Sequence, residues 1–256
     1  SQSHPGGEVA PEPGILPGFA FDLATVNKDG HNRDFTKEAM RQEARTEVIE
    51  GKPLFLIGSP ACTDYCSWQD LNAQKFGWPE GEVERRMIAS DVHLASVAEL
   101  YKIQMDGGRY FLHENPDGAR SWSRRPMTEI VQDTRVQRIT GDQCQYGHQS
   151  HQGAPAKKPT GWMSNSLELL KKLARRCSGR RGECSRPRGG RHETASGRVA
   201  REAAIYPFRL CRAILEGSGT SSSAMAISMG SAVRSRLVRG GTGTVAATLL
   251  LRRAGR

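Results

Sequence analysis

Chemically reactive side chains follow two short apolar runs of the sequence. Cys62 comes soon after the run 54–57, and Glu114 and Asn115 come directly after the run 110–113. Each run has the length and composition of a buried strand. Because ligands gather at the carboxyl ends of strands in an open α/β sheet, the sequence predicts a thiol and an acid that face one substrate.

The surroundings of Cys62 favour a nucleophile, although an isolated cysteine is more often a buried packing residue. Pro60 stiffens the turn before the thiol, and the polar run 63–65 follows it. If a helix begins there, its N-terminal dipole would favour the thiolate that nucleophilic attack requires. Cys66 is the competing thiol, and a metal or redox pair of Cys62 with Cys66 is disfavoured because no second pair matches it.

Glu114 stands at the end of an apolar strand, where a carboxylate is costly unless it is paired or used. A desolvated glutamate can stay protonated and serve as an acid. The alternative interpretation is a glutamate that caps a helix or forms a salt bridge.

Strand-like and helix-like patterns alternate along the chain, which predicts an α/β fold with a mainly parallel sheet. Gly107 and Gly108 are expected to end the longest helix, Thr36 to cap the first, and Pro207 to lie in the first turn of the last. The expected strands are 19–23, 54–57, 110–113 and 136–140, and the expected helices are 37–50, 82–105, 127–131, 166–175 and 208–215.

Composition divides the 256 residues into one candidate domain and two terminal segments. Residues 1–14 are rich in Pro and Gly and are expected to be disordered, and 217–256 are expected to form a flexible low-complexity tail. The range 15–216 remains as a single α/β domain.

Positive charge is concentrated in the second half of the chain. The net charge of +10 combines −6 for residues 1–110 with +16 for the remainder, and 171–201 hold 11 basic residues against two acids. Such a segment predicts binding to a polyanion such as nucleic acid, and a solvated basic loop is the alternative.

No membrane span is predicted, because no segment approaches about eighteen consecutive apolar residues. No signal peptide is predicted, because the N-terminus lacks a basic segment followed by an apolar one. The six cysteines are therefore expected to be reduced thiols in an intracellular protein. Cys177, Cys184 and His192 form a C-x6-C-x7-H pattern. Three ligands of irregular spacing are weak evidence for zinc, so no metal site is predicted.

Several motifs, in their order along the chain, resemble those of the DNA cytosine-5 methyltransferases. The matching segments are Pro60-Ala61-Cys62, Glu114-Asn115-Pro116 and 205–214. The stretch 142–147, with 157–160 and Asn165, is similar to the Cys-Gln-Tyr-Gly…Lys-Pro-Thr…Asn stretch of phage-type members. The resemblance covers about 19–215, and it extends to the methyltransferase-like segments of retroelement polyproteins.

The resemblance implies a three-layer Rossmann-like methyltransferase core that acts on DNA with S-adenosylmethionine as cofactor. Cys62 would add to carbon 6 of a flipped-out cytosine, Glu114 would hold a proton on ring nitrogen 3, and Asn115 would orient the loops. The implied cofactor contacts are Asp22, Asn27, Asp34 and Pro60. The implied nucleic-acid contacts are Lys157, Lys158, Lys171, Lys172, Arg175 and Arg176. A nuclear location would follow.

The sequence also departs from the family. Ala61 replaces the second proline of Pro-Pro-Cys, Pro116 replaces a valine or isoleucine, and the Phe-x-Gly-x-Gly cofactor loop has no counterpart, as in an N-terminally truncated member. The alternative function is a non-catalytic nucleic-acid-binding segment of a mobile-element polyprotein. A cysteine hydrolase is less favoured, since none of His93, His113 and His192 is clearly placed as its base.

Overall fold

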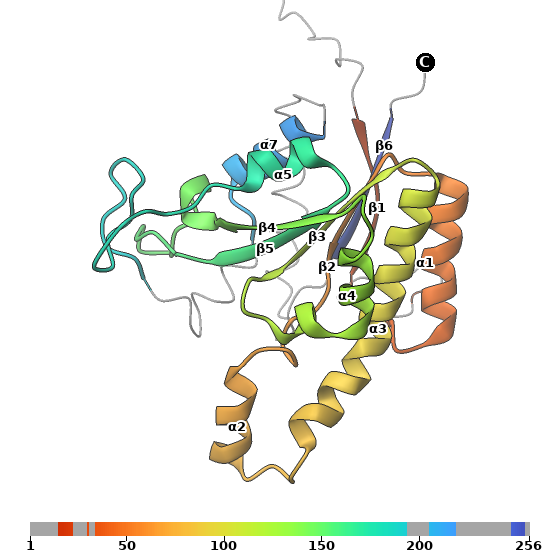
Figure 1. Cartoon of the computed structure of the whole chain (residues 1–256), viewed down its shortest axis with the longest axis horizontal. Helices are drawn as coiled ribbons and strands as arrows, with labels where there is room; N and C mark the ends of the chain where they lie inside the picture. The colour runs from red at the N-terminus through yellow and green to blue at the C-terminus, as the bar shows by residue number, and fades with distance from the viewer. Residues whose placement is uncertain (1–14, 23–29, 31–33, 194–204, 219–246, 254–256) are drawn as a thin grey trace, which may run out of the picture.

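The computed structural model describes residues 15–22, 30, 34–193, 205–218 and 247–253, with the backbone alone at 15–22 and 247–253. Within these residues six strands form one sheet in the order β1-β6-β2-β3-β5-β4 (Figure 1). The strands are β1 Ile15–Asp22, β2 Phe55–Ser59, β3 Tyr110–Pro116, β4 Gln137–Asp142, β5 Pro159–Ser164 and β6 Ala247–Arg253.

The sheet is mixed. Only β2 and β3 pair in parallel, and the other four neighbouring pairs of described strands are antiparallel. The predicted α/β class is confirmed, and the prediction of a mainly parallel sheet is wrong. The difference arises at β5 and β6, which the sequence did not predict. β5 lies between β3 and β4 and β6 between β1 and β2, and each is antiparallel to both of its neighbours.

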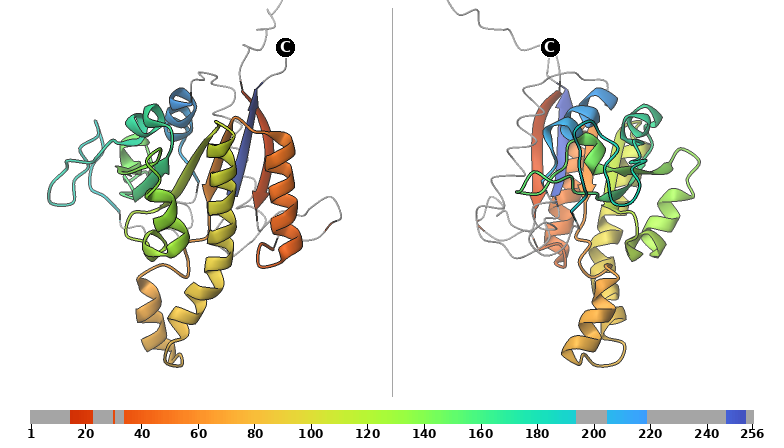
Figure 2. Two further views of the ribbon diagram at one scale, coloured as in Figure 1. Left: turned by 45° about the vertical axis from the view of Figure 1, so that its right-hand side comes forward. Right: turned by 90° about the vertical axis from the view of Figure 1, so that its left-hand side faces the viewer.

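The expected helices are present, and one more forms. The described α-helices are α1 Glu38–Gly51, α2 Trp68–Phe76, α3 Glu82–Asp106, α4 Arg125–Val131, α5 Leu167–Leu173 and α7 Phe208–Gly217. The 3-10 turns are η1 Arg120–Ser123 and η2 Gln143–Tyr146. Helix α2 was not predicted. It projects from the body together with the first half of α3 (Figures 1 and 2).

Helices cover both faces of the sheet, giving three layers (Figure 2). One core joins the sheet to α1, α3 and α4 and includes Leu56, Phe111 and Met163. The other joins the sheet to α5 and α7 and includes Ile57, Leu112 and Trp162. Successive strand residues thus alternate between the two cores, which fixes the face that each polar side chain enters.

Local chemistry sets the helix ends. Gly108 takes a positive φ of 67° after α3, as the predicted stop requires. Lys37, rather than Thr36, occupies the N-cap of α1, and the Thr36 hydroxyl donates to Asp34 Oδ1 at 2.6 Å. Pro207 occupies the N-cap of α7, one residue before the predicted place.

Strand β6 lies inside the segment expected to be a flexible tail, between β1 and β2. The rest of that tail and the expected disorder at 1–14 lie outside the described residues. Among the helices described, none is long and apolar enough to cross a membrane.

Candidate functional site

The two strand ends that carry the reactive residues are neighbours. β2 and β3 are parallel, and Gly58 pairs with His113, so Ser59 lies level with Glu114. Neighbouring strands are about 4.8 Å apart. The loop that leaves β2 with Cys62 therefore begins beside Glu114, as the sequence predicted.

The loop that carries Cys62 is anchored on α3 and η1. The buried Tyr65 donates from its hydroxyl to Asp91 at 2.9 Å, and its carbonyl accepts from the backbone N–H of Arg120. Asp64 accepts from Ser90 Oγ at 2.6 Å. Helix α2 begins only at Trp68, so no helix begins directly after Cys62 to favour its thiolate.

Glu114 is buried on the face of the sheet that α7 covers. Its Oε1 atom lies 3.3 Å from Lys158 Nζ, and the exposed fractions of the two side chains are 9% and 18%. The carboxylate also accepts a hydrogen bond from Tyr206, whose hydroxyl lies 2.9 Å from Ser59 Oγ. Oε1 itself accepts no hydrogen bond from the described residues. A buried acceptor in this state can take a ligand N–H.

Cys62 shares the electrostatic environment of Glu114 and Lys158. Burial raises the pKa of the thiol to about 11, and the negative charge of Glu114 adds to this rise, while Lys158 opposes it. Cys62 is thus a thiol at neutral pH in this state. Glu114 and Lys158 thus lie close enough to Cys62 for their charges to act on its thiol, and we call the three residues the thiol–acid site.

Asn115 does not belong to the thiol–acid site. It is buried on the opposite face of the sheet, where its Nδ2 lies 3.4 Å from His113 Nε2. His113 Nδ1 lies 2.9 Å from the Tyr101 hydroxyl, and burial lowers the pKa of His113 to about 3. Asn115 therefore packs at the end of β3 on the face of the sheet opposite Glu114. The neutral, enclosed His113 does not face Cys62 as a base.

Comparison with protein-family models, curated proteins and solved structures returns no match for this chain. The resemblance to the DNA cytosine-5 methyltransferases accordingly rests on the motifs quoted above.

Of the four implied cofactor contacts, the structure describes the side chains of Asp34 and Pro60. Asp34 is occupied by the turn before α1, where the Thr36 hydroxyl holds the pKa of its carboxyl below the usual value. Pro60 is buried next to the Cys62 loop. The side chain of Asp22 and all of Asn27 lie outside the described residues.

The implied nucleic-acid contacts divide into three groups. Lys158 enters the thiol–acid site, whereas Lys157 lies beside it in sequence. Lys171 and Lys172 are exposed on α5, with their ammonium groups 2.6 Å from Glu168 and 3.9 Å from Glu216.

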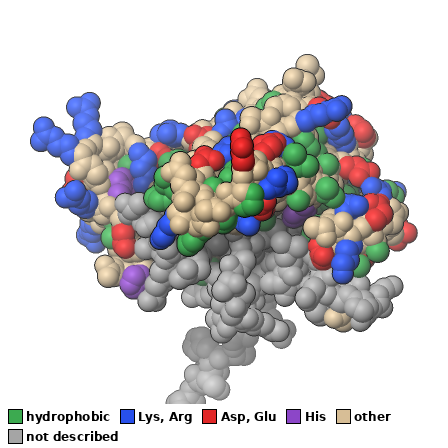
Figure 3. Space-filling model, turned by 90° about the horizontal axis from the view of Figure 1, so that it is seen from below, with side chains coloured by type: hydrophobic (Ala, Val, Ile, Leu, Met, Phe, Trp, Pro, Cys, Tyr) green, Lys and Arg blue, Asp and Glu red, His purple; other side chains and the backbone are tan. Residues whose placement is uncertain are grey.

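Beyond α5, the guanidinium of Arg175 lies over the ring of Tyr146, and Arg176 forms an ion pair with the buried Asp142. Asp142 N–H donates to the Arg175 carbonyl at 2.8 Å, so the basic end of α5 returns to the sheet edge where β4 ends. Lys and Arg side chains gather at this end of the molecule (Figure 3).

Sequence reasoning gave no catalytic role to Tyr206. It precedes α7, about ninety residues beyond Glu114 in the chain. Only the packing of α7 on the sheet brings its hydroxyl to the carboxylate, and no local pattern signals such a contact.

Proposed function

We propose that this protein is a DNA cytosine-5 methyltransferase-like enzyme in which Cys62 and Glu114 act on one cytosine ring. The observation that carries the proposal is the buried Glu114 carboxylate, which has an open acceptor atom beside Lys158 and raises the pKa of Cys62. The order of the surrounding motifs supports cytosine as the substrate.

The chemistry assigned to these residues is activation of the base. The Cys62 thiol loses its proton to water, and its sulfur forms a bond to carbon 6. The carbon 5–carbon 6 π electrons move to the carbon 4–carbon 5 bond, and the carbon 4–nitrogen 3 π electrons take a proton at nitrogen 3 from Glu114, which is protonated when the base binds. Carbon 5 then becomes nucleophilic. A base in a duplex must leave its stack to reach the thiol, and Lys158 would contribute a point charge where arginine usually binds.

Electrostatics would couple thiolate formation to base binding. The charge of Glu114 raises the pKa of Cys62, so the free site holds a thiol. When a proton taken up with the base is held between the Glu114 carboxylate and cytosine nitrogen 3, part of that charge is neutralised, and the pKa of Cys62 falls because burial is then opposed by Lys158 with less contribution from Glu114. Cys62 would then ionise preferentially with the base in place, which protects it from side reactions.

The resemblance implies S-adenosylmethionine as the methyl donor, but the described side chains do not form a site for it. Asp34 is engaged in its own turn, and Pro60 offers no polar side-chain contact. β6 is antiparallel to β2, so its carboxyl end points away from the edge that carries Cys62. The mechanism derived for this chain therefore stops at the activated cytosine.

Methyl transfer to DNA tests the proposal. The full chain, incubated with DNA and S-adenosylmethionine labelled in its methyl group, should label carbon 5 of cytosine. Cys62→Ser should abolish the labelling, and Cys66→Ser should retain it. Equal labelling by Cys62→Ser and the unaltered protein would exclude Cys62 as the nucleophile.

A second candidate is a non-catalytic nucleic-acid-binding segment of a mobile-element polyprotein, acting on nuclear DNA. The protonated Cys62 and the exposed basic residues after α5 favour it. It requires DNA binding that weakens steeply with salt and is unchanged in Cys62→Ser, without methyl transfer. Salt-independent binding would count against it.

A further inference from the structure

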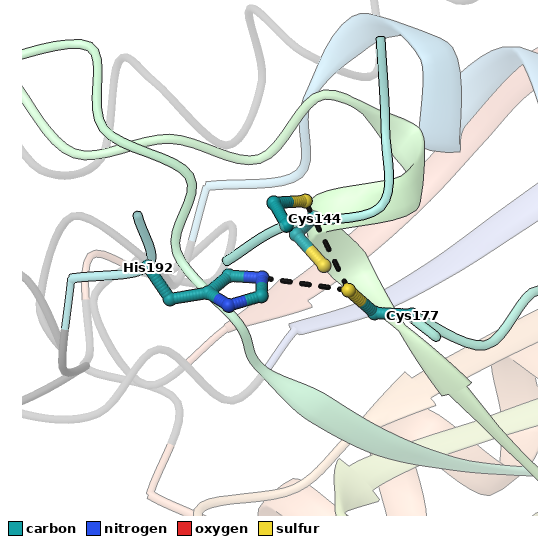
Figure 4. A group of neighbouring side chains, drawn as sticks. Cys144, Cys177 and His192 are labelled. Atoms are coloured by element: carbon teal, nitrogen blue, oxygen red, sulfur yellow. Dashed lines mark hydrogen bonds between the residues drawn. The ribbon is translucent and has the colours of Figure 1, made fainter. Parts of the chain in front are cut away.

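Three cysteines and one histidine converge beside the end of β4. The ligand atoms of Cys144, Cys177, Cys184 and His192 all lie within 4.8 Å of one another. Cys144 comes from η2, Cys177 follows α5, and the other two lie in the segment 178–193. Figure 4 shows the side chains of Cys144, Cys177 and His192 turned toward one common point.

The distances within this cluster fit a tetrahedral zinc ion. Zinc bonds of about 2.3 Å to sulfur and about 2.0 Å to nitrogen place tetrahedral ligands about 3.8 Å apart for two sulfurs and about 3.6 Å for sulfur and nitrogen. The Sγ atoms of Cys177 and Cys184 are 3.9 Å apart, and Cys177 Sγ lies 3.5 Å from His192 Nε2. The sulfur separation is far longer than a disulfide bond of about 2.05 Å.

Donors around the sulfurs match thiolate ligands. Cys177 Sγ accepts from the backbone N–H of Ser185 at 3.4 Å and from its hydroxyl at 3.5 Å. The Gln145 amide donates to Cys144 Sγ at 3.5 Å and to Cys184 Sγ at 3.7 Å. Hydrogen bonds of this kind orient metal ligands and stabilise their charge.

The segment that carries Cys184 and His192 is ordered without an apolar core. Its backbone closes a small hairpin, in which His192 N–H donates to Gly182 at 2.7 Å and Cys184 N–H to Gly190 at 2.8 Å. The residues 178–193 contain no large aliphatic or aromatic side chain. Small units without a core usually need a metal or a disulfide to fold.

We propose that Cys144, Cys177, Cys184 and His192 bind a structural zinc ion that folds the arginine-rich hairpin 178–193 against the sheet edge. Four protein ligands fill the tetrahedral shell and leave no open position for catalysis. The sequence pattern alone showed three of the ligands. The fold supplies the fourth, since Cys144 lies far from Cys177 in the chain but close in space. The zinc site does not depend on the proposed methyltransferase function.

Zinc would also set the position of the basic side chains relative to the thiol–acid site. Glu193 N–H donates to the Pro155 carbonyl at 2.9 Å, and Gln143 N–H to the Lys158 carbonyl at 3.1 Å. These hydrogen bonds connect the hairpin to the segment before β5, in which Lys158 lies 3.3 Å from Glu114. Its exposed arginines are Arg180, Arg181, Arg188 and Arg191.

Metal content of the full chain, purified under reducing conditions, is the first test. Elemental analysis should find one zinc ion per chain, and Co²⁺ exchanged into the site should show the visible absorption of a tetrahedral thiolate complex. Cys177→Ser and Cys184→Ser should lose the ion, whereas the matched control Cys66→Ser should retain it. Absence of stoichiometric zinc, or equal zinc in all variants, would overturn the proposal.

Trypsin digestion of the unaltered protein provides a test that does not depend on variant folding. The zinc-loaded protein should resist cleavage after Arg180, Arg181, Arg188 and Arg191. A chelator should expose these bonds, and added Zn²⁺, but not Mg²⁺, should restore protection. Cleavage that is equally fast with and without zinc, or protection that depends on a disulfide, would contradict a zinc-folded hairpin.

Discussion

Lys158 Nζ lies 3.3 Å from Glu114 Oε1 at the edge of the sheet where β3 ends and β5 is about to begin. The two groups act in opposite directions on Cys62, because Glu114 raises the pKa of the thiol and Lys158 lowers it. Their balance, together with burial, sets the protonation of the candidate nucleophile.

The reactivity of Cys62 should therefore rise only at high pH. With a pKa of about 11 in place of the ordinary 9.0, Cys62 holds roughly a hundredfold less thiolate at pH 7 than an unperturbed cysteine. Alkylation by iodoacetamide, followed residue by residue with mass spectrometry, should increase with pH up to about 11. Glu114→Gln removes a negative charge and should shift the profile to lower pH. An unchanged profile in Glu114→Gln would show that the two side chains are not coupled.

Loss of Lys158 should have the opposite effect. Lys158→Met removes the positive charge that lowers the pKa of Cys62, so alkylation at a fixed pH should slow. It also leaves Glu114 buried without its ion-pair partner, which should reduce the free energy of unfolding by roughly 1–3 kcal/mol. Lys157→Met is the matched control and should change neither quantity appreciably. The account fails if both variants alkylate alike.

Gly58 should not tolerate a side chain. A Cβ atom there would collide with the Tyr101 hydroxyl, which bonds His113 behind the thiol–acid site. Gly58→Ala should lower the unfolding free energy in urea by about 2–4 kcal/mol, through overpacking and loss of this hydrogen bond. Gly118→Ala, with no atom within 4 Å of the added Cβ, should cost less than about 0.5 kcal/mol. Similar losses of unfolding free energy in both variants would show that the Tyr101 hydroxyl does not lie against Gly58.

Arginines of the hairpin should account for part of the salt dependence of DNA binding. If Arg188 and Arg191 contact phosphates, Arg188→Gln with Arg191→Gln should reduce the slope of log K against log salt by roughly 2. Arg85→Gln, on the projecting part of α3, should leave the slope unchanged. Fluorescence anisotropy over a salt series measures each slope, and equal slopes for all three proteins would exclude the hairpin from the interface.

Much of the fold could be predicted because its elements carry local signals. Apolar spacing indicated α3 as 82–105 against the observed Glu82–Asp106, and β2 and β3 were placed with their adjacent ends. Strand β5 was missed because Pro159 and Gly161 interrupt its pattern, and packing of Trp162 and Met163 in the two cores compensates. Without β5 and β6, the predicted strands β1 to β4, which all run in one direction, indicated a parallel sheet.

The sequence predicted only part of the candidate site. Cys62 and Glu114 were visible as strand-end residues, but the pKa of Cys62 depends on burial and on charges that only the fold brings together. Tyr206 and Cys144 reach their partners through packing between elements distant in the chain, which no local spacing reveals.

Hydrogen exchange at carbon 5 of cytosine tests the central claim most directly, because it requires Cys62 and Glu114 but no methyl donor. Addition of the thiolate to carbon 6 lets carbon 5 take a proton from water; loss of the original hydrogen and elimination of the thiol then restore the base. DNA tritiated at carbon 5 of cytosine should release tritium into water with the unaltered protein and with Cys66→Ser. Release should fall to background with Cys62→Ser and with Glu114→Gln. Background release by the unaltered protein, or undiminished release by Cys62→Ser, would contradict the account.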